Sequence, residues 1–279
     1  METLVETEEN EIKLVATEVT QAKMLASLRG KKDEELQGIL RVLKAALHLA
    51  EFDISQEKVE NIFDEYYDTH DLALFGFHAS LRVRREGTNL SVTAKKLKGQ
   101  ERGQFSRSEH SQTLSEAQYA EYIRDGFRQI VELVFLDVVG KPLSLVLRVN
   151  NERRSFSLRR GNELYELALD LASFTNPKTG KMSDTQIEVE IEALNDAAKS
   201  KLGGIRRNLV DIVKTFDYSK ESKYERGIKF FGLDKSRPQQ WLKRLIEWWN
   251  SDIGLARLGI IVAVVGIAIS IILALASIK

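Results

Sequence analysis

The sequence contains a series of short segments in which charged side chains alternate with aliphatic ones. Side chains of a β-strand point to opposite faces with a period of two, so each segment would carry its charges on one face. The segments are residues 9–13, 81–84, 93–95, 107–109, 166–170 and 188–192. Some charged faces are acidic and others are basic. This pattern predicts strands that together hold a polyanion and a divalent metal ion.

The most acidic of these faces would carry Glu188, Glu190 and Glu192. A charged strand face is most often the solvated side of a sheet, but a soluble surface usually mixes charges of both signs. Neighbouring carboxylates repel one another unless a cation neutralises them. The three glutamates therefore favour a site for Mg²⁺ or Mn²⁺, because hard cations prefer oxygen ligands.

The composition excludes several kinds of site. Lys and Arg number 41 and so do Asp and Glu, so the net charge gives no general attraction for nucleic acid. The chain has no cysteine, which excludes disulfides and thiolate metal sites. Its four histidines, His48, His70, His78 and His110, lack the spacing of zinc ligands. Anions must therefore be bound by local clusters of charge.

Residues 258–278 form a long apolar stretch with Ser270 and Ser277 as its only polar side chains. As a helix rising about 1.5 Å per residue, it would match the hydrocarbon core of a bilayer, about 30 Å thick. We expect a single-pass C-terminal anchor in the membrane, and the glutamate-rich N-terminus does not resemble a signal peptide. The basic residues Lys243, Arg244 and Arg257 precede the span, which favours a cytoplasmic N-terminal domain.

The rest of the chain alternates between predicted strands and helices. Strands are predicted over residues 9–17, 59–69, 79–86, 89–97, 104–112, 143–149, 153–158, 163–171 and 185–194. Helices are predicted over residues 20–28, 33–51, 115–135 and 196–216, and Ser115 with Gln118 forms a capping box. A largely antiparallel sheet of this size loses its exposed edges when it closes. The expected fold is α+β: an eight-stranded antiparallel β-barrel tunnel, charged inside, with helices packed outside and a C-terminal transmembrane helix.

This fold divides the chain into three regions. The tunnel domain covers residues 1–232, an amphipathic juxtamembrane linker covers 233–254, and the transmembrane tail anchor covers 255–279. The linker contains Trp241, Trp248 and Trp249. These side chains suit either the membrane interface or a helix packed back on the domain.

The ordered segments resemble those of one known family, the CYTH domains of the triphosphate tunnel metalloenzymes. Residues 9–13 match its Glu-x-Glu-x-Lys signature. Residues 66–96 resemble its next block, which has a Tyr-Asp-Thr turn, Leu-Arg-x-Arg and Thr-x-Lys. Arg107-Ser108-Glu109, the acidic segments 166–170 and 188–192, and Ser222-Lys223 with Arg226-Gly227 follow in the expected order. The resemblance covers residues 5–232, with His70 standing where proline is common.

The resemblance implies a metal-dependent hydrolase that acts on a triphosphate inside a charged tunnel. The implied metal ligands are Glu9, Glu11, Glu109, Glu166, Asp170, Glu188, Glu190 and Glu192. The implied phosphate-binding residues are Lys13, Arg82, Arg84, Lys95, Arg107, Arg153, Lys223 and Arg226. Arg148 is the alternative to Arg153 at the inward basic position, and Arg154 is expected on the outward face. The implied catalytic residues are Glu9, Glu11, Lys13, Glu188 and Glu190.

Several functions are compatible with these residues. Inorganic triphosphate is the leading substrate, and a nucleoside or thiamine triphosphate is an alternative. A nucleotidyl (adenylate) cyclase, a polyphosphate-binding or polyphosphate-synthesising membrane module, and a sensor without turnover are the rivals. The expected partners are a small triphosphate and, through residues 258–278, the lipid bilayer; no nucleic acid is expected.

Overall fold

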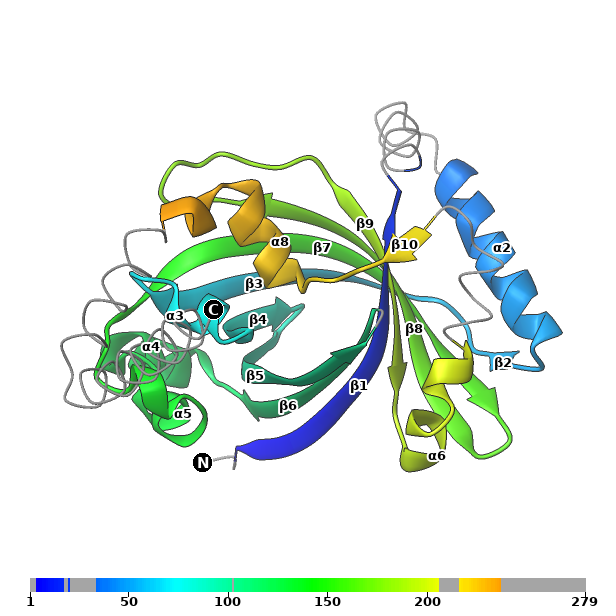
Figure 1. Cartoon of the computed structure of the whole chain (residues 1–279), viewed down its shortest axis with the longest axis horizontal. Coiled ribbons are helices and arrows are strands. Elements are labelled where there is room, and N and C mark those ends of the chain that lie inside the picture. Colours follow the sequence, from blue (N-terminus) through cyan, green and yellow to red (C-terminus); the bar gives the residue numbers. More distant parts are fainter. Residues whose placement is uncertain (1–3, 18–19, 21–33, 102, 206–215, 237–279) are drawn as a thin grey trace, which may run out of the picture. The chain divides into compact units, whose positions relative to one another are not determined.

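The computed structural model describes residues 4–17, 20, 34–101, 103–205 and 216–236 (Figure 1). The predicted membrane span, nearly all of the predicted linker and nearly all of the predicted helix over 20–28 lie outside these residues. Among the residues that are described, no helix has the length and apolar character needed to cross a membrane. The backbone divides into two compact units, Met1–Phe231 and Gly232–Lys279, and the described part of the second contains a 3₁₀ helix, η2 (Leu233–Ser236).

Eight strands of the first unit close into an antiparallel barrel. In order around the barrel they are β1 (Val5–Ala16), β6 (Gln104–Thr113), β5 (Asn89–Glu101), β4 (Ala79–Glu86), β3 (Lys58–Thr69), β7 (Leu143–Arg160), β8 (Glu163–Thr175) and β9 (Gln186–Ala193). β1 pairs with β6 on one side and with β9 on the other, which completes the ring. Two short strands extend the sheet: β2 (Asp53–Ile54) pairs with β7, and β10 (Phe216–Tyr218) pairs with β1. The predicted eight-stranded antiparallel barrel is confirmed.

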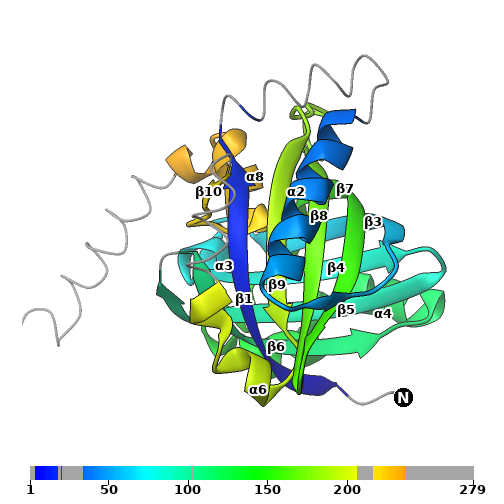
Figure 2. The same ribbon diagram turned by 90° about the vertical axis from the view of Figure 1, so that its right-hand side faces the viewer.

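The aliphatic faces of the strands point outward and are covered by helices. On one side α2 (Glu34–Leu49) packs Leu36, Leu40, Leu43 and Leu47 against β1, β7, β8 and β9 (Figure 2). Each buried leucine contributes about 2 kcal/mol to folding. On the other side, β4 and β5 pack against α3 (Ala73–Gly76), α4 (Glu116–Asp125), α5 (Arg128–Val134) and the 3₁₀ helix η1 (Leu136–Val138). The charged faces are therefore left to the inside of the barrel.

Three predicted elements differ from the structure. The helix predicted over 115–135 is two helices, because Gly126 and Phe127 adopt left-handed conformations with φ of 70° and 60°. The capping box of Ser115 and Gln118 that begins α4 is confirmed. The two strands predicted over 143–149 and 153–158 form one strand, β7. Asn150 and Asn151, which lie between the two predicted strands, pair with β3 on one side and β8 on the other.

The third difference concerns the helix predicted over 196–216. It begins with the short helix α6 (Asp196–Lys199), whereas Phe216 lies in β10 because it pairs with Ala16 of β1. Residues 206–215 lie outside the described part of the chain. The charged segment at 222–227 belongs to a helix, α8 (Lys223–Phe230), which is drawn in front of the barrel in Figure 1. Its N-cap is Ser222, in a capping box with Glu225.

Candidate active site

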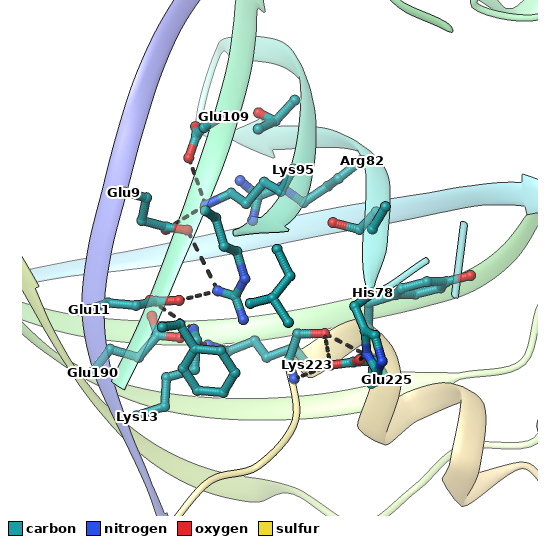
Figure 3. Close-up of a pocket in the computed structure, with 18 of the residues that line it drawn as sticks. Glu9, Glu11, Lys13, His78, Arg82, Lys95, Glu109, Glu190, Lys223 and Glu225 are labelled. Atoms are coloured by element: carbon teal, nitrogen blue, oxygen red, sulfur yellow. Dashed lines mark hydrogen bonds and ion pairs between the residues drawn. The ribbon is translucent and has the colours of Figure 1, made fainter. Parts of the chain in front are cut away.

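A cavity of about 210 Å³ lies inside the barrel, where β1, β4, β5, β6, β7 and β9 meet the first turn of α8 (Figure 3). Strand alternation places the inward residues, because Glu11 of β1 lies opposite Glu192 of β9 and Lys13 lies opposite Glu190. Most of the predicted site residues line this cavity: Glu9, Glu11, Lys13, Arg82, Arg84, Lys95, Arg107, Glu109, Arg153, Glu190, Glu192 and Lys223. Acidic and basic groups predicted from distant segments are thus brought together.

The other four predicted residues do not line the cavity. Asp170 and Glu188 are fully buried and contact Lys223, whose Nζ lies 2.7 Å and 2.5 Å from their carboxylates. Arg226 forms an ion pair with Glu188 and donates from Nε to Gln186. Glu166 is more exposed and lies 3.6 Å from Arg153.

One charged cluster, the β1–β6 cluster, is built from Glu9, Glu11, Lys95, Arg107 and Glu109. The Nζ atom of Lys95 lies 2.5 Å from Glu9 and 2.8 Å from Glu109, and Arg107 forms an ion pair with Glu11. Burial alone would raise the pKa of Glu9, but the charges of Lys95 and Arg107 outweigh it and hold that pKa at about 2. Burial, reinforced by the Glu9 carboxylate, raises the pKa of Glu11.

A second charged cluster, the β8–β9 cluster, is built from Asp170, Glu188 and Glu190. One carboxylate oxygen from each lies within 4.8 Å of the others, an arrangement that could hold a metal ion. Arg153 forms a bidentate ion pair with Asp170 through bonds of 2.8 Å and 2.7 Å. Burial opposes ionisation of Asp170, but Lys223 and Arg153 outweigh it and lower its pKa to about 2. Burial also opposes ionisation of Glu190, but Lys13, Lys223 and Arg153 outweigh it and lower the pKa of Glu190.

Glu192 differs from its neighbours. It lines the cavity, and within the described residues its carboxylate has no cation at ion-pair distance. Burial, reinforced by the nearby Glu9 carboxylate, raises the pKa of Glu192 to about 8. The group is therefore protonated near neutral pH in the absence of an added cation.

Two of the predicted basic residues, Arg82 and Arg84, contact a carboxylate that the sequence analysis did not identify. Asp64, which is 1% exposed, accepts bonds of 2.8 Å and 2.9 Å from Arg84 and lies 3.6 Å from Arg82. It lies on the same face of β3 as Tyr66, two residues further on, and Tyr66 lines the cavity. The inward alternation of Asp64 and Tyr66 within the predicted strand 59–69 was the signal that could have identified it.

The three arginines considered for the basic position on β7 have different surroundings. Arg153 lines the cavity. Arg148 donates to Glu65, and Arg154 donates to Glu152. Neither arginine lines the cavity.

The donor set fits a hard divalent cation. Every candidate ligand in the two clusters is a carboxylate oxygen, the kind that Mg²⁺ and Mn²⁺ prefer. The Oε2 atom of Glu9 is buried and has no hydrogen bond among the described residues. A buried acceptor without a donor is costly, and a bound cation would satisfy it. The residues present are therefore compatible with the metal that the sequence predicts.

A second cavity, of about 520 Å³, adjoins the first. The two share Arg82, Arg84, Thr93 and Glu109 as lining residues. Beyond these residues the second cavity is lined mainly by small hydroxyl side chains, namely Ser91, Ser111 and Thr113. The interior therefore continues past the charged region into a polar space without further cations among its lining residues.

Comparison with known proteins places this geometry in a family. Solved structures with a similar chain fold include a protein from Hippeastrum, named an adenylyl cyclase and described as having a dominant triphosphatase activity. It shares 16% identity and a TM-score of 0.50, over 79% of this chain and 95% of that one. A Bacillus halodurans protein named an adenylate cyclase matches at 14% identity and a TM-score of 0.49, over 79% and 97% of the two chains.

A comparison with curated proteins found no match. The sequence does match the model of the CYTH domain over residues 35–228, which is more than half of its length. The matched residues include β3 to β9 and the first part of α8, and β1 completes the barrel from the N-terminal side. The chain is a member of the CYTH domain family.

Proposed function

We propose that the protein hydrolyses a small triphosphate compound in its charged barrel, with Mg²⁺ or Mn²⁺ as cofactor. The observation that carries the proposal is the convergence of acidic and basic side chains on one cavity inside a closed barrel. A triphosphate bound with a divalent metal needs both kinds of charge within a few ångströms of each other.

The phosphate oxygens are bound by the basic residues. Arg82, Arg84, Arg107, Arg153 and Arg226 offer planar forks for bidentate contacts, whereas Lys13, Lys95 and Lys223 supply point charges. All eight side chains are held by carboxylates in the structure. Their positions are therefore set before a substrate arrives, which lowers the cost of ordering them.

The metal is held by carboxylates of the two clusters. Glu9, Glu11, Glu188 and Glu190 would be its ligands, with Glu109, Glu166, Asp170 and Glu192 completing the acidic set. When bound, the ion polarises phosphoryl oxygens and neutralises the charge that develops on them.

Hydrolysis requires little covalent chemistry from the protein. The oxygen of a water molecule attacks the terminal phosphorus while the bond to the bridging oxygen breaks, and orthophosphate leaves with the remaining chain as the second product. A glutamate that faces the cavity orients that water. Positioning and electrostatic stabilisation supply most of the rate in such reactions.

The substrate proposed first is inorganic triphosphate, because the charged region addresses phosphates and metal. Thiamine or nucleoside triphosphates are alternatives, since the second cavity offers space for an organic group joined to the phosphates. A nucleotidyl cyclase would require in addition a pocket that fixes a base and a ribose hydroxyl. The C-terminal anchor over residues 258–278 and a cytoplasmic tunnel domain remain part of this proposal, supported by the apolar sequence.

The test is phosphate release by the full-length protein with Mg²⁺ or Mn²⁺ and with EDTA as control. The panel is inorganic triphosphate, ATP and thiamine triphosphate. Metal-dependent orthophosphate release is expected. Cyclic nucleotide and pyrophosphate from ATP would instead indicate a cyclase. Triphosphate binding without any product would indicate a sensor or a polyphosphate-binding module.

A further inference from the structure

The sequence motif Tyr66-Tyr67-Asp68-Thr69 contains a carboxylate that the proposed reaction does not use. Asp68 is 0% exposed and lies at the end of β3, outside the lining of the cavity. It accepts hydrogen bonds from the backbone N–H groups of Thr69, Leu74 and Phe75, at 2.6, 2.9 and 3.0 Å. Asp68 thus fixes the short helix α3 to the end of β3.

The same carboxylate also holds α8. The hydroxyl of Tyr224 donates to Asp68 Oδ2 over 2.6 Å, across 156 positions of sequence. The Tyr224 ring is 1% exposed and stacks on Tyr66, with ring centroids 5.1 Å apart and planes 13° apart. Tyr224 is therefore held at its ring face and at its hydroxyl.

Tyr224 follows Lys223, whose side chain extends from α8 into the charged cavity. Lys223 Nζ lies 2.7 Å from Asp170, 2.5 Å from Glu188 and 2.8 Å from Glu190. Figure 3 shows Lys223 at the start of α8, next to the cavity. Because Tyr224 is the next residue of the same helix, its position affects where the Lys223 ammonium group lies.

The segment that receives α8, residues 68–78, is unusually shaped. His78, at its other end, contacts Glu225 of α8, with Nδ1 2.7 Å from Oε1. Leu72 and His78 have φ of 49° and 51°, in the left-handed region that non-glycine residues seldom adopt. Such conformations persist where the surrounding structure over-determines them. The segment thus contacts α8 near both of its ends.

We propose that Asp68 and Tyr224 are positioning residues that seat α8 and so place Lys223 among the carboxylates and phosphates of the tunnel. This inference rests on the proposed function, in which Lys223 binds phosphate. Without the Tyr224 hydroxyl, Asp68 loses one of its donors and α8 loses its bond to β3. Lys223 can then shift, although Tyr224, which also lines the cavity, keeps its ring in the stack on Tyr66.

The test compares Tyr224→Phe with Tyr165→Phe in the full-length protein. Both substitutions remove one hydroxyl from a buried ring. The Tyr165 hydroxyl donates to Glu163 at 2.8 Å, and its ring packs in the α2 core without lining the charged cavity. We expect Tyr224→Phe to lower kcat/KM for the triphosphate by about tenfold, and Tyr165→Phe to leave it unchanged.

A second comparison separates positioning from general loss of stability. In a Lys223→Ala background, Tyr224→Phe should cause no further loss of kcat/KM, because the group that it positions is gone. An additive loss there, or an equal loss from Tyr165→Phe, would overturn the inference. Asp68→Asn should likewise lower kcat/KM when Lys223 is present and cause no further loss in the Lys223→Ala background.

The inference can fail independently of the hydrolase proposal. If the wild-type protein releases no phosphate, calorimetric binding of inorganic triphosphate replaces turnover as the measurement. Tyr224→Phe should then weaken that binding about tenfold, and only when Lys223 is present. Unchanged binding in Tyr224→Phe would reject the positioning role whatever reaction the protein catalyses.

Discussion

The ammonium group of Lys95 lies 2.5 Å from a carboxylate oxygen of Glu9. Lys95 is expected to bind phosphate and Glu9 to bind metal, so the phosphate-binding and metal-binding halves of the proposed site neutralise each other's charge. Arg107 with Glu11, and Lys223 with Glu188, repeat this relationship. A metal ion must compete with these cations for its ligands.

The first prediction is that metal and triphosphate bind cooperatively. Phosphate oxygens share the charge of the positioned cations, which weakens their ion pairs with the carboxylates and leaves carboxylate oxygens available to the metal. We expect saturation with one ligand to raise the affinity for the other by at least about fivefold, and by the same factor in both directions. Calorimetry with a non-hydrolysable triphosphate, corrected for the metal complex in solution, measures this coupling. Independent binding would contradict it.

The second prediction concerns Glu188 and Glu190. Replacing both with alanine should lower metal-dependent turnover by about 100-fold or more, because ligands of the metal are removed. Triphosphate should still bind, since the basic residues remain. The matched control is Glu132→Ala, which removes an exposed carboxylate paired with Arg128 on α5. Turnover that survives the double substitution would exclude these residues as metal ligands.

The third prediction is a pH dependence caused by Glu192. Its pKa of about 8 in the folded protein lies above the ordinary 4.5, so the folded state binds the extra proton between these values. Stability of the metal-free protein should therefore be greatest at the acidic end of this range. It should fall as pH rises toward 8, by up to about 1.4 kcal/mol per pH unit.

Thermal unfolding in EDTA between pH 5 and pH 8 measures this effect. Glu192→Gln should flatten the decline, leaving the contributions of other carboxyls whose pKa is raised, such as Glu11 and Asp68. Equal slopes for the wild-type and variant proteins would show that Glu192 is ionised throughout.

The fourth prediction concerns the packing of α8. Gly227 lies so close to β7 that a Cβ atom there would be 2.4 Å from Cδ2 of Leu147. In an open helix Gly→Ala would stabilise the protein by up to about 1 kcal/mol. Here we expect Gly227→Ala to destabilise it by about 1–3 kcal/mol through overpacking.

Denaturant unfolding of the variants in a double-mutant cycle tests whether contact with Leu147 causes the loss of stability. The pair Gly227→Ala with Leu147→Ala should cost less than the sum of the two single changes, because the smaller side chain makes room for the methyl group. Strict additivity would mean that Leu147 is not the obstacle.

The sequence was most informative where strand alternation governs the fold. Residues such as Lys13, Arg82 and Glu190 lie inside the barrel because the positions on either side of each are aliphatic and must be covered by helices. Alternation predicts the face of a side chain, but it does not predict which side chains meet across the barrel. The contact of Lys223 with Asp170 depends on the path of α8, and no local pattern contains it.

Breaks between elements were less predictable. Gly126 ends α4 with a left-handed residue, and Phe127 continues in the same unusual conformation because its ring is buried at 1% exposure. Asn151 lies between two strands predicted as separate, yet it belongs to β7 and its side chain donates to Asp170 over 2.9 Å. In both places tertiary contacts override the local preference.

The closure of the barrel by β1 and β9 also has a consequence for folding. Lys13 and Glu190 meet across 177 positions of sequence, so the ring cannot close until nearly the whole domain is assembled. Until then both strands are open edges, which invite pairing with other chains. Charged side chains on such edges discourage that pairing. Before they meet any ligand, Glu9, Glu11, Lys13, Glu188 and Glu190 therefore protect the unfinished barrel from aggregation.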